Sequence, residues 1–263
     1  MKSLLITNDD GIDAPALAPL AAELGKISTV TVAAPGGERS WIGKAITRTG
    51  VVATERVMRH GIAMWSVDGY PADCVQIGSY GILDARPDLV VSGINIGSNR
   101  GSAFATASGT LGAVVEAANT GIPGIAFSAM SVGDWASWVT WVRTEPALEM
   151  WTRLATIAAD IVATLFDVGF PPGVDVLSVN LPPDANMDTP RVVTTLARTR
   201  YGRLFAGSNG VYHHEFDGIL HVEGEADGSD LAALDAGLIS ITAIRMANSV
   251  PLDGSLRERL ERS

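Results

Sequence analysis

Short apolar runs alternate with segments of helical periodicity over the first two thirds of the chain. The runs are rich in β-branched residues, a pattern typical of strands buried on both faces of a parallel sheet. Between them, apolar residues recur at intervals of three and four, as on one face of a helix. The predicted strands cover residues 3–7, 29–34, 88–92, 122–128 and 175–180, and the predicted helices run from Asp13 to Leu24, from the turn at 68–72 to about Tyr80, from Ser108 to Asn119 and from Glu149 to Asp167. This alternation predicts an α/β fold with a doubly wound, mostly parallel sheet.

Two of these boundaries rest on single residues. Asp13 has a side chain suited to an N-cap, and Pro15 suits the first helical turn. Gly93 is predicted to end the strand at 88–92, which leaves residues 93–101 as a loop at the carboxyl end of that strand. Extended pieces are expected within 51–67.

The sequence pattern changes after Pro182. Residues 191–196 and 219–223 alternate like strands, and the glycine-rich polar segment 201–218 between them is typical of an extended arm or hairpin. A late strand at 238–243 and a charged helix at 252–261 follow. We therefore expect a core of residues 1–181 and an extension of residues 182–263 that packs on the core or on a partner subunit. The arm's aromatic residues, Tyr201, Phe205, Tyr212 and Phe216, favour a homo-oligomer built through it.

Two further groups of residues invite a functional interpretation. Trp135, Trp138 and Trp141 recur at intervals of three and predict one face of a helix or lid, with Trp151 nearby, and burial in a core or an oligomer contact is favoured over cofactor stacking. The adjacent histidines at 213–214 are interpreted as structural or interfacial, because no carboxylate stands at metal-ligand spacing from them.

Composition narrows the classes of function. The chain has 263 residues, 47% of them hydrophobic and 18% charged, as in a well-packed globular protein. Its formal charge of −10 disfavours binding to nucleic acid or to anionic membranes. The single cysteine, Cys74, excludes an intramolecular disulfide and is expected to be a buried thiol. Without a membrane-spanning run or a signal-like N-terminus, a cytoplasmic protein is expected.

The candidate chemistry lies where the first strand ends. Asp9 and Asp10 follow residues 3–7 directly, and only a cation, a shared proton or full solvation relieves the repulsion between two adjacent carboxylates. The alternative is a turn with two solvated aspartates. Further along, the sequence Ser108-Gly109-Thr110 opens a helix whose free N–H groups and hydroxyls can bind an anion, although helix capping alone also explains a serine there.

Right-handed crossovers place the loops after parallel strands on one edge of the sheet. In the strand order usual for doubly wound sheets, three of these loops can then face one cavity. The first carries Asp9 and Asp10, the second carries Ser40 and the third carries Asn95. Two carboxylates, a hydroxyl and an amide oxygen are hard ligands that suit Mg²⁺ or Mn²⁺ better than zinc.

Six motifs now point to a known family. The segments NDDGIDAP, APGGERS, DGYPADCV, PDLVVSGINIGSN, SGTLGA and GIPGIAFS, in this order, resemble the SurE family of metal-dependent 5'/3'-nucleotidases, also called survival proteins. The match is close over about the first half of the chain and looser up to the DLAALDAGLISIT stretch. The resemblance implies a Rossmann-like core, hydrolysis of phosphate monoesters such as nucleoside monophosphates, and dimers or tetramers formed through an exchanged C-terminal segment and an extended hairpin.

The resemblance also assigns roles to residues. It implies one divalent cation per subunit, Mg²⁺ or Mn²⁺, held by Asp9, Asp10, Ser40 and Asn95, with Asp9, Asp10 and Asn95 as the catalytic residues. Contacts to the phosphate fall on Ser40, Asn99, Ser108, Gly109 and Thr110. The chain departs from the family at Trp41, where glycine is usual, at 42–46 beside it, and at 242–244. These departures leave the metal chemistry in place and open the question of substrate range.

The expected function is therefore metal-dependent hydrolysis of nucleoside monophosphates by an activated water. Other expectations stay open: a phosphatase for a different small phosphate ester, or a non-catalytic nucleotide-binding oligomer. A mechanism through an aspartyl-phosphate is weaker, because the two carboxylates are adjacent rather than spaced as nucleophile and acid.

Overall fold

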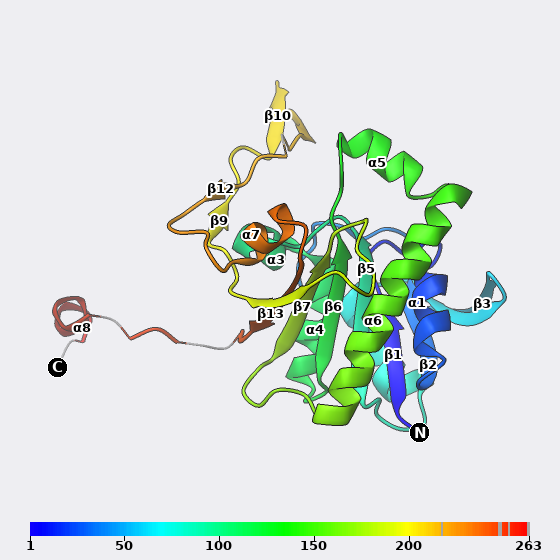
Figure 1. Ribbon diagram of the computed structural model, residues 1–263. Helices are drawn as coiled ribbons and strands as arrows, with labels where there is room; N and C mark the ends of the chain where they lie inside the picture. The colour runs from blue at the N-terminus through cyan, green and yellow to red at the C-terminus, as the bar shows by residue number, and fades with distance from the viewer. Residues whose placement is uncertain (217, 247–248, 252, 262–263) are drawn as a thin grey trace.

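A nine-stranded sheet organises the protein (Figure 1). The computed structural model describes residues 1–216, 218–246, 249–251 and 253–261. The strand order is β3-β4-β2-β1-β5-β6-β7-β13-β8. The strands are β1 (Ser3–Thr7), β2 (Thr29–Pro35), β3 (Thr54–Arg59), β4 (Ile62–Val67), β5 (Leu89–Ile96), β6 (Gly124–Ala129), β7 (Val176–Leu181), β8 (Arg191–Thr194) and β13 (Ile239–Ile244).

Six neighbouring strands of this sheet, from β4 to β7, run parallel, whereas β3 and β13 pair antiparallel with β4 and β7. Strand β1 lies between β2 and β5, so the doubly wound arrangement is confirmed. The carboxyl ends of these three strands therefore meet at one edge of the sheet.

Two hydrophobic layers cover the sheet. Leu4 and Ile6 of β1 face the layer formed with α1 (Leu17–Leu24) and α6 (Leu148–Val168), whereas Leu5 faces the layer formed with α2 (Pro71–Ile77) and α4 (Gly109–Asn119). Successive side chains of a strand point to opposite faces, so a short, wholly apolar run serves both layers.

The remaining helices are short, and all but the C-terminal α8 lie in connections between strands or longer helices. They are α3 (Gly101–Ala107), α5 (Trp135–Trp141), α7 (Asp230–Asp235) and α8 (Gly254–Leu260), with a π-helical turn at Gly78–Ile82 and a 3₁₀ turn at Glu145–Ala147. Among the residues that the structure describes, no helix combines the length and apolar character needed to cross a membrane.

The segment after Pro182 returns to the sheet and also leaves it. Strand β13 enters the sheet beside β7, and β8 pairs with β13. A hairpin of β10 (Phe205–Ser208) and β11 (Val211–His214) forms within the predicted arm and projects away from the sheet (Figure 1). Two short strands, β9 (Thr199–Arg200) and β12 (His221–Val222), pair at its base. The division of the chain at residue 181 stays a prediction.

Three local predictions differ from the structure. Helix α1 has Ala16, not Asp13, at its N-cap, because the chain turns through 14–16 first, and Asp13 instead forms an ion pair with Arg59. Strand β5 does not end at Gly93: it continues to Ile96 after a shift in its pairing with β6 between Ser92 and Asn95. The predicted loop at 93–101 is thus partly strand, and helix α3 was not predicted. The predicted start of the last helix, Leu252, lies outside the described residues.

Candidate active site

Backbone hydrogen bonds join the loops after β1 and β2. Asn8 holds a tight turn through its amide, which donates to the Gly11 carbonyl oxygen at 2.9 Å and accepts from the Gly11 N–H at 3.1 Å. The Ile12 N–H donates to the Pro35 carbonyl oxygen at 2.8 Å, and the Arg39 N–H donates to the Asp9 carbonyl oxygen at 2.6 Å. Asp9 and Ser40 are therefore brought to the same edge, as the strand order predicted.

A buried hydrogen-bonded network fixes Asp9. The Thr110 hydroxyl donates to Asp9 Oδ1 at 2.6 Å, and the Asn99 amide approaches Thr110 Oγ1 at 3.4 Å and donates to Ser128 Oγ at 2.8 Å. The Asn99 N–H in turn donates to Asn180 Oδ1 at 2.8 Å. All five side chains are buried. Three predicted site residues are thus joined in one chain of contacts.

Sequence reasoning missed the last two members of this network. Ser128 and Asn180 stand near the carboxyl ends of β6 and β7 and face the same edge as Asn99. The available signal was a polar residue at the end of an otherwise apolar buried strand, which needs a partner when it is buried. The sequence therefore indicated that each of these side chains needs a hydrogen-bond partner. It did not indicate which residue, because the partners lie far away in the sequence.

Asp10 and Asn95 are brought together through the end of β5. Asp10 Oδ2 accepts a hydrogen bond from the Ile96 N–H at 3.0 Å. The Asn95 amide nitrogen donates to the Gly97 carbonyl oxygen at 2.7 Å, so Oδ1 is the atom of this side chain that could bind a metal. The extension of β5 past Gly93 is what places Ile96 beside Asp10.

Ser40 is exposed, and its hydroxyl donates to Glu38 Oε1 at 2.8 Å rather than to either aspartate. The segment that follows Ser40 is fastened to the helices. The Gly43 N–H donates to the Ala107 carbonyl oxygen at 2.8 Å, and Lys44 Nζ lies 2.6 Å from Glu116 Oε2. Ser40 thus stands beside the aspartates on a loop anchored at both ends.

The start of α4 lies directly on Asp9. Ser108 is the N-cap residue, and its Oγ accepts from the Leu111 N–H at 3.1 Å, so capping accounts for this side chain. A Cβ at Gly109 would lie 2.8 Å from Asp9 Cβ, closer than two carbon atoms can approach. The absence of a side chain at Gly109 is therefore what allows the helix end to approach the carboxylate.

Burial raises the pKa of both aspartates, and the charge of Asp9 adds to the effect on Asp10. Burial raises the pKa of Asp9 to about 6, although the Thr110 hydrogen bond lowers it. Burial, and then the charge of Asp9, raise the pKa of Asp10 well above its ordinary range. A bound cation would remove this penalty by favouring the ionised carboxylates.

The donor atoms at this edge fit a hard divalent cation. They are carboxylate, hydroxyl and amide oxygens, the ligands that Mg²⁺ and Mn²⁺ prefer. Among the described residues, no group of three or more His, Cys, Asp or Glu side chains is placed to hold a metal. A cation beside Asp9 and Asp10 would therefore also draw on neutral oxygens, as Ser40 and Asn95 offer.

Two other residues considered from the sequence, Cys74 and His214, do not take part in these contacts. Cys74 is a buried free thiol, as predicted. His214 packs against Trp41 and Phe205.

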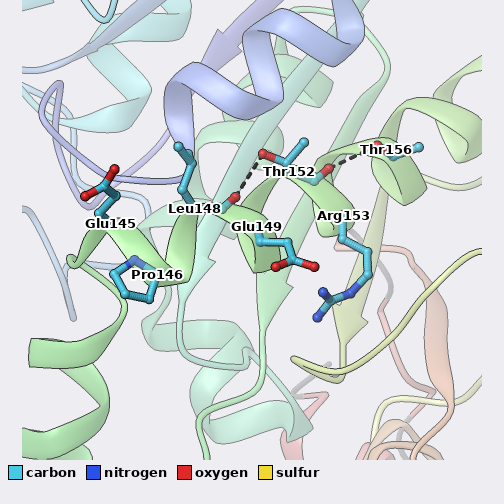
Figure 2. A pocket seen from close by; sticks show the side chains of 7 residues that line it. All are labelled: Glu145, Pro146, Leu148, Glu149, Thr152, Arg153 and Thr156. Atoms are coloured by element: carbon cyan, nitrogen blue, oxygen red, sulfur yellow. Dashed lines mark hydrogen bonds between the residues drawn. The ribbon is translucent and has the colours of Figure 1, made fainter.

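A surface hollow of about 640 Å³ lies along the first turns of α6 (Figure 2). It is lined by Glu145, Pro146, Leu148, Glu149, Thr152, Arg153 and Thr156, none of which belongs to the candidate site.

Comparison with known proteins decides the family. Residues 4–203 match the family model described as survival protein SurE. The chain belongs to the SurE family. Among curated SurE relatives, the protein named 5'-nucleotidase SurE from Methanocella arvoryzae is 33% identical over 248 residues, which cover 92% of this chain and 91% of the relative. The protein of the same name from Methanothrix thermoacetophila is 32% identical over 267 residues and 99% of each chain.

A solved SurE structure confirms the fold. The crystal structure of the SurE protein from Aquifex aeolicus covers 98% of this chain and 98% of its own, with a TM-score of 0.74 and 28% identity. The SurE match spans the loops that carry the aspartate pair, Ser40 and Asn95, and also the start of α4. The α/β, Rossmann-like fold predicted from the sequence is therefore confirmed.

Proposed function

We propose that this SurE-family chain is a divalent-metal-dependent phosphomonoesterase that hydrolyses nucleoside 5'-monophosphates, with 3'-monophosphates as a second substrate class. The family, with curated relatives named 5'-nucleotidase SurE, makes the chain a phosphoric monoester hydrolase. The observation that carries the metal dependence is the adjacent aspartate pair, which burial and repulsion leave in need of a cation.

One Mg²⁺ or Mn²⁺ per subunit would be held by Asp9, Asp10, Ser40 and Asn95. When bound, the ion supplies Lewis-acid polarisation of a phosphate oxygen and activation of water. Asp10 Oδ2 is oriented by the Ile96 N–H, and Asp9 Oδ1 by the Thr110 hydroxyl, so each carboxylate keeps its second oxygen for the cation or for orienting the attacking water. A carboxylate that accepts the water's proton lets the new oxygen–phosphorus bond form as the ester P–O bond breaks, and the leaving alkoxide takes up a proton from solvent.

The start of α4 supplies the phosphate contacts. The N–H groups of Gly109 and Thr110 lie in the first turn, where an α-helix offers no intrahelical acceptors, and the helix dipole favours an anion there. The buried Asn99 amide adjoins Thr110 and adds a neutral donor when it exchanges its hydrogen bond to Ser128 Oγ for a phosphate oxygen. Ser108 holds this turn in place through its cap. The donors neutralise charge that builds up on the phosphoryl oxygens as the leaving group departs.

A substrate panel tests this function against its alternatives. Purified protein would be given p-nitrophenyl phosphate and the 5'- and 3'-monophosphates of the four common nucleosides, with Mn²⁺, with Mg²⁺ and with a chelator. Metal-stimulated phosphate release that is greatest on the nucleotides is expected. Release from p-nitrophenyl phosphate alone would favour a different small ester, and no release from a folded protein that still binds nucleotide would favour the non-catalytic alternative.

Trp41 is the residue by which this chain could alter the substrate range. It adopts a positive φ of 59° beside Ser40 and remains 41% exposed. Its ring lies 5.0 to 5.7 Å from four other aromatic rings, those of His214, Phe216, Phe104 and Tyr201. These ring contacts join the Ser40 loop to the arm. The exposed part of the ring still leaves a face for a base or another planar group.

We expect Trp41→Gly to change the ranking of nucleoside monophosphates by more than tenfold, since one stacking contact contributes roughly 1–3 kcal/mol. The effect on p-nitrophenyl phosphate should be smaller, and the metal requirement should persist. Trp41→Phe, which keeps an aromatic ring at the same position, is the matched control. Equal scaling of kcat/KM for every substrate would place the ring outside the substrate pocket and limit its role to holding the arm.

The arm is proposed to join subunits into a dimer or tetramer. Strand β11 is exposed along its whole length, and Phe205, Val211 and Tyr212 are each more than half exposed. Exposed apolar residues gathered on a projecting hairpin mark a surface for association. Light scattering at micromolar concentration should give a multiple of the 27.5 kDa chain mass, and Tyr212→Glu should lower it. A fully active wild-type monomer would contradict this role of the arm.

A further inference from the structure

The tryptophan-rich segment forms a wall beside the candidate active site. In Figure 1, α5 stands beyond the edge of the sheet at which the parallel strands end. A Cβ at Gly97 would lie 3.2 Å from two ring carbons of Trp135, so this ring rests on the backbone just past Asn95. Trp138, one helical turn later, is buried in the core at 3% exposure and fixes the helix to the rest of the protein.

The same segment fixes the backbone next to an arginine. The indole N–H of the fully buried Trp151 donates to the Val142 carbonyl oxygen at 2.8 Å. Arg143 follows directly, and one guanidinium nitrogen, Nη1, donates to the Val139 carbonyl oxygen at 2.9 Å. Anchored from two sides, Arg143 has a defined position at the end of α5, although its side chain is 42% exposed.

Arg143 faces the loop that carries Ser40. Its Nη2 lies 3.9 Å from Glu38 Oε2, and Glu38 Oε1 accepts the hydrogen bond of the Ser40 hydroxyl. Glu38 thus links the guanidinium of Arg143 to Ser40, a proposed ligand of the cation. This contact places a positive charge against the acidic side of the site.

We propose that Arg143 is a binding residue for the phosphoryl group, which it reaches by exchanging its loose contact with Glu38 for the oxygens of the substrate. The inference rests on the proposed function and adds a residue to it. A phosphate monoester is a dianion, and a guanidinium can bind two of its oxygens through parallel N–H donors. The pair with Glu38 is long and half exposed, so breaking it costs little.

A positive charge at Arg143 explains how this acidic edge of the sheet can bind an anionic substrate. Asp9, Asp10 and Glu38 would repel a phosphate, and one divalent cation only offsets the two aspartates. Arg143 supplies the further positive charge from a segment that is separate from the cation's proposed ligands. Glu38 holds the guanidinium near the site before the substrate arrives.

Direct titration of inorganic phosphate tests the inference without turnover. Calorimetry in the presence of Mn²⁺ would compare wild type with Arg143→Ala and Arg143→Lys. We expect alanine to weaken phosphate binding by about 10- to 100-fold, the effect of losing a charge-assisted hydrogen-bonded pair, and lysine to weaken it less. Guanidinium ion added to the alanine variant should restore part of the hydrolysis of p-nitrophenyl phosphate. Arg191→Gln, which removes an arginine from a surface pair with Asp160, is the control and should bind as wild type does.

A double variant distinguishes phosphate binding by Arg143 from a merely structural role of this residue. If Arg143 only neutralises Glu38, the loss should vanish when Arg143→Ala is combined with Glu38→Gln, and the inference would be overturned. If Arg143 binds phosphate, the loss persists in that background. Wild-type affinity in Arg143→Ala would overturn the inference outright. A wild-type protein that binds phosphate through Arg143 but hydrolyses no ester would refute the proposed function alone.

Discussion

Asp10→Asn is expected to reduce kcat/KM for every phosphomonoester by roughly a thousandfold, because removing one preorganised charge-stabilising group from an active site costs about 10²–10³ in rate. The substitution removes a carboxylate from the proposed cation site and so lowers metal affinity as well. An amide keeps the shape of the side chain and still accepts the hydrogen bond from the Ile96 N–H. The fold should therefore survive.

Stability in metal-free buffer should hold or rise in this variant. Burial and Asp9 raise the pKa of Asp10 in the folded protein, so the ionised native state is penalised relative to the unfolded chain. The gain from the neutral amide is absent below the ordinary aspartate pKa of 3.8, where both states hold the proton, and it grows as the pH rises. Urea unfolding of the wild type and of Asp10→Asn at pH 4 and pH 8 measures this gain in the free energy of unfolding.

Asp13→Asn is the matched control, since Asp13 lies three residues further on, is exposed and pairs with Arg59. It should keep wild-type activity and metal affinity. Near-wild-type turnover of Asp10→Asn at the same Mn²⁺ concentration would remove Asp10 from the site. Equal losses in both variants would show that negative charge at this edge acts at long range rather than through a ligand.

The sheet was predictable because its central strands are buried on both faces. Such strands must be apolar at every position, as Leu4, Leu5 and Ile6 are, and the two hydrophobic layers then follow from alternation alone. The acidic pair stood out for the opposite reason, since two adjacent carboxylates at a strand end repel each other unless a cation, a shared proton or full solvation relieves the repulsion. The local sequence was therefore enough to predict the central strands and to single out the acidic pair.

The connections between loops were not predictable in the same way. Asn99 finds its partners on β6 and β7, so its hydrogen bonds have no signal at a fixed sequence spacing. Strand β5 passes Gly93 because its pairing with β6 shifts there, which depends on the neighbouring strand rather than on the glycine. Arg143 lies near Glu38 on a turn that the buried Trp151 holds through the Val142 carbonyl oxygen. Tertiary contacts decide all of these features.

The close approach of α4 to Asp9 yields a second large effect. Gly109→Ala should lower kcat/KM by about 100-fold, because a displacement of about 1 Å in a catalytic group can cost that much. The new methyl group would lie 2.8 Å from Asp9 Cβ and 2.9 Å from Asp9 Oδ2, with the Arg39 carbonyl oxygen 3.0 Å away on another side. Asp9 is held by Thr110, and Arg39 by backbone hydrogen bonding, so neither can move without disturbing the loops that form the site.

Two opposing terms set the effect of Gly109→Ala on stability. Alanine favours a helix over glycine by about 1 kcal/mol, and Gly109 has no positive φ that would oppose the substitution. Overpacking a tight contact typically costs about 1–3 kcal/mol, so we expect a net loss of up to about 2 kcal/mol, which urea unfolding would measure. Gly37→Ala is the matched control in the neighbouring loop, because a Cβ there meets no atom within 4 Å. If Gly109→Ala were as active as this control, α4 would have to shift freely away from Asp9, and its start could not be the rigid phosphate cradle proposed for it.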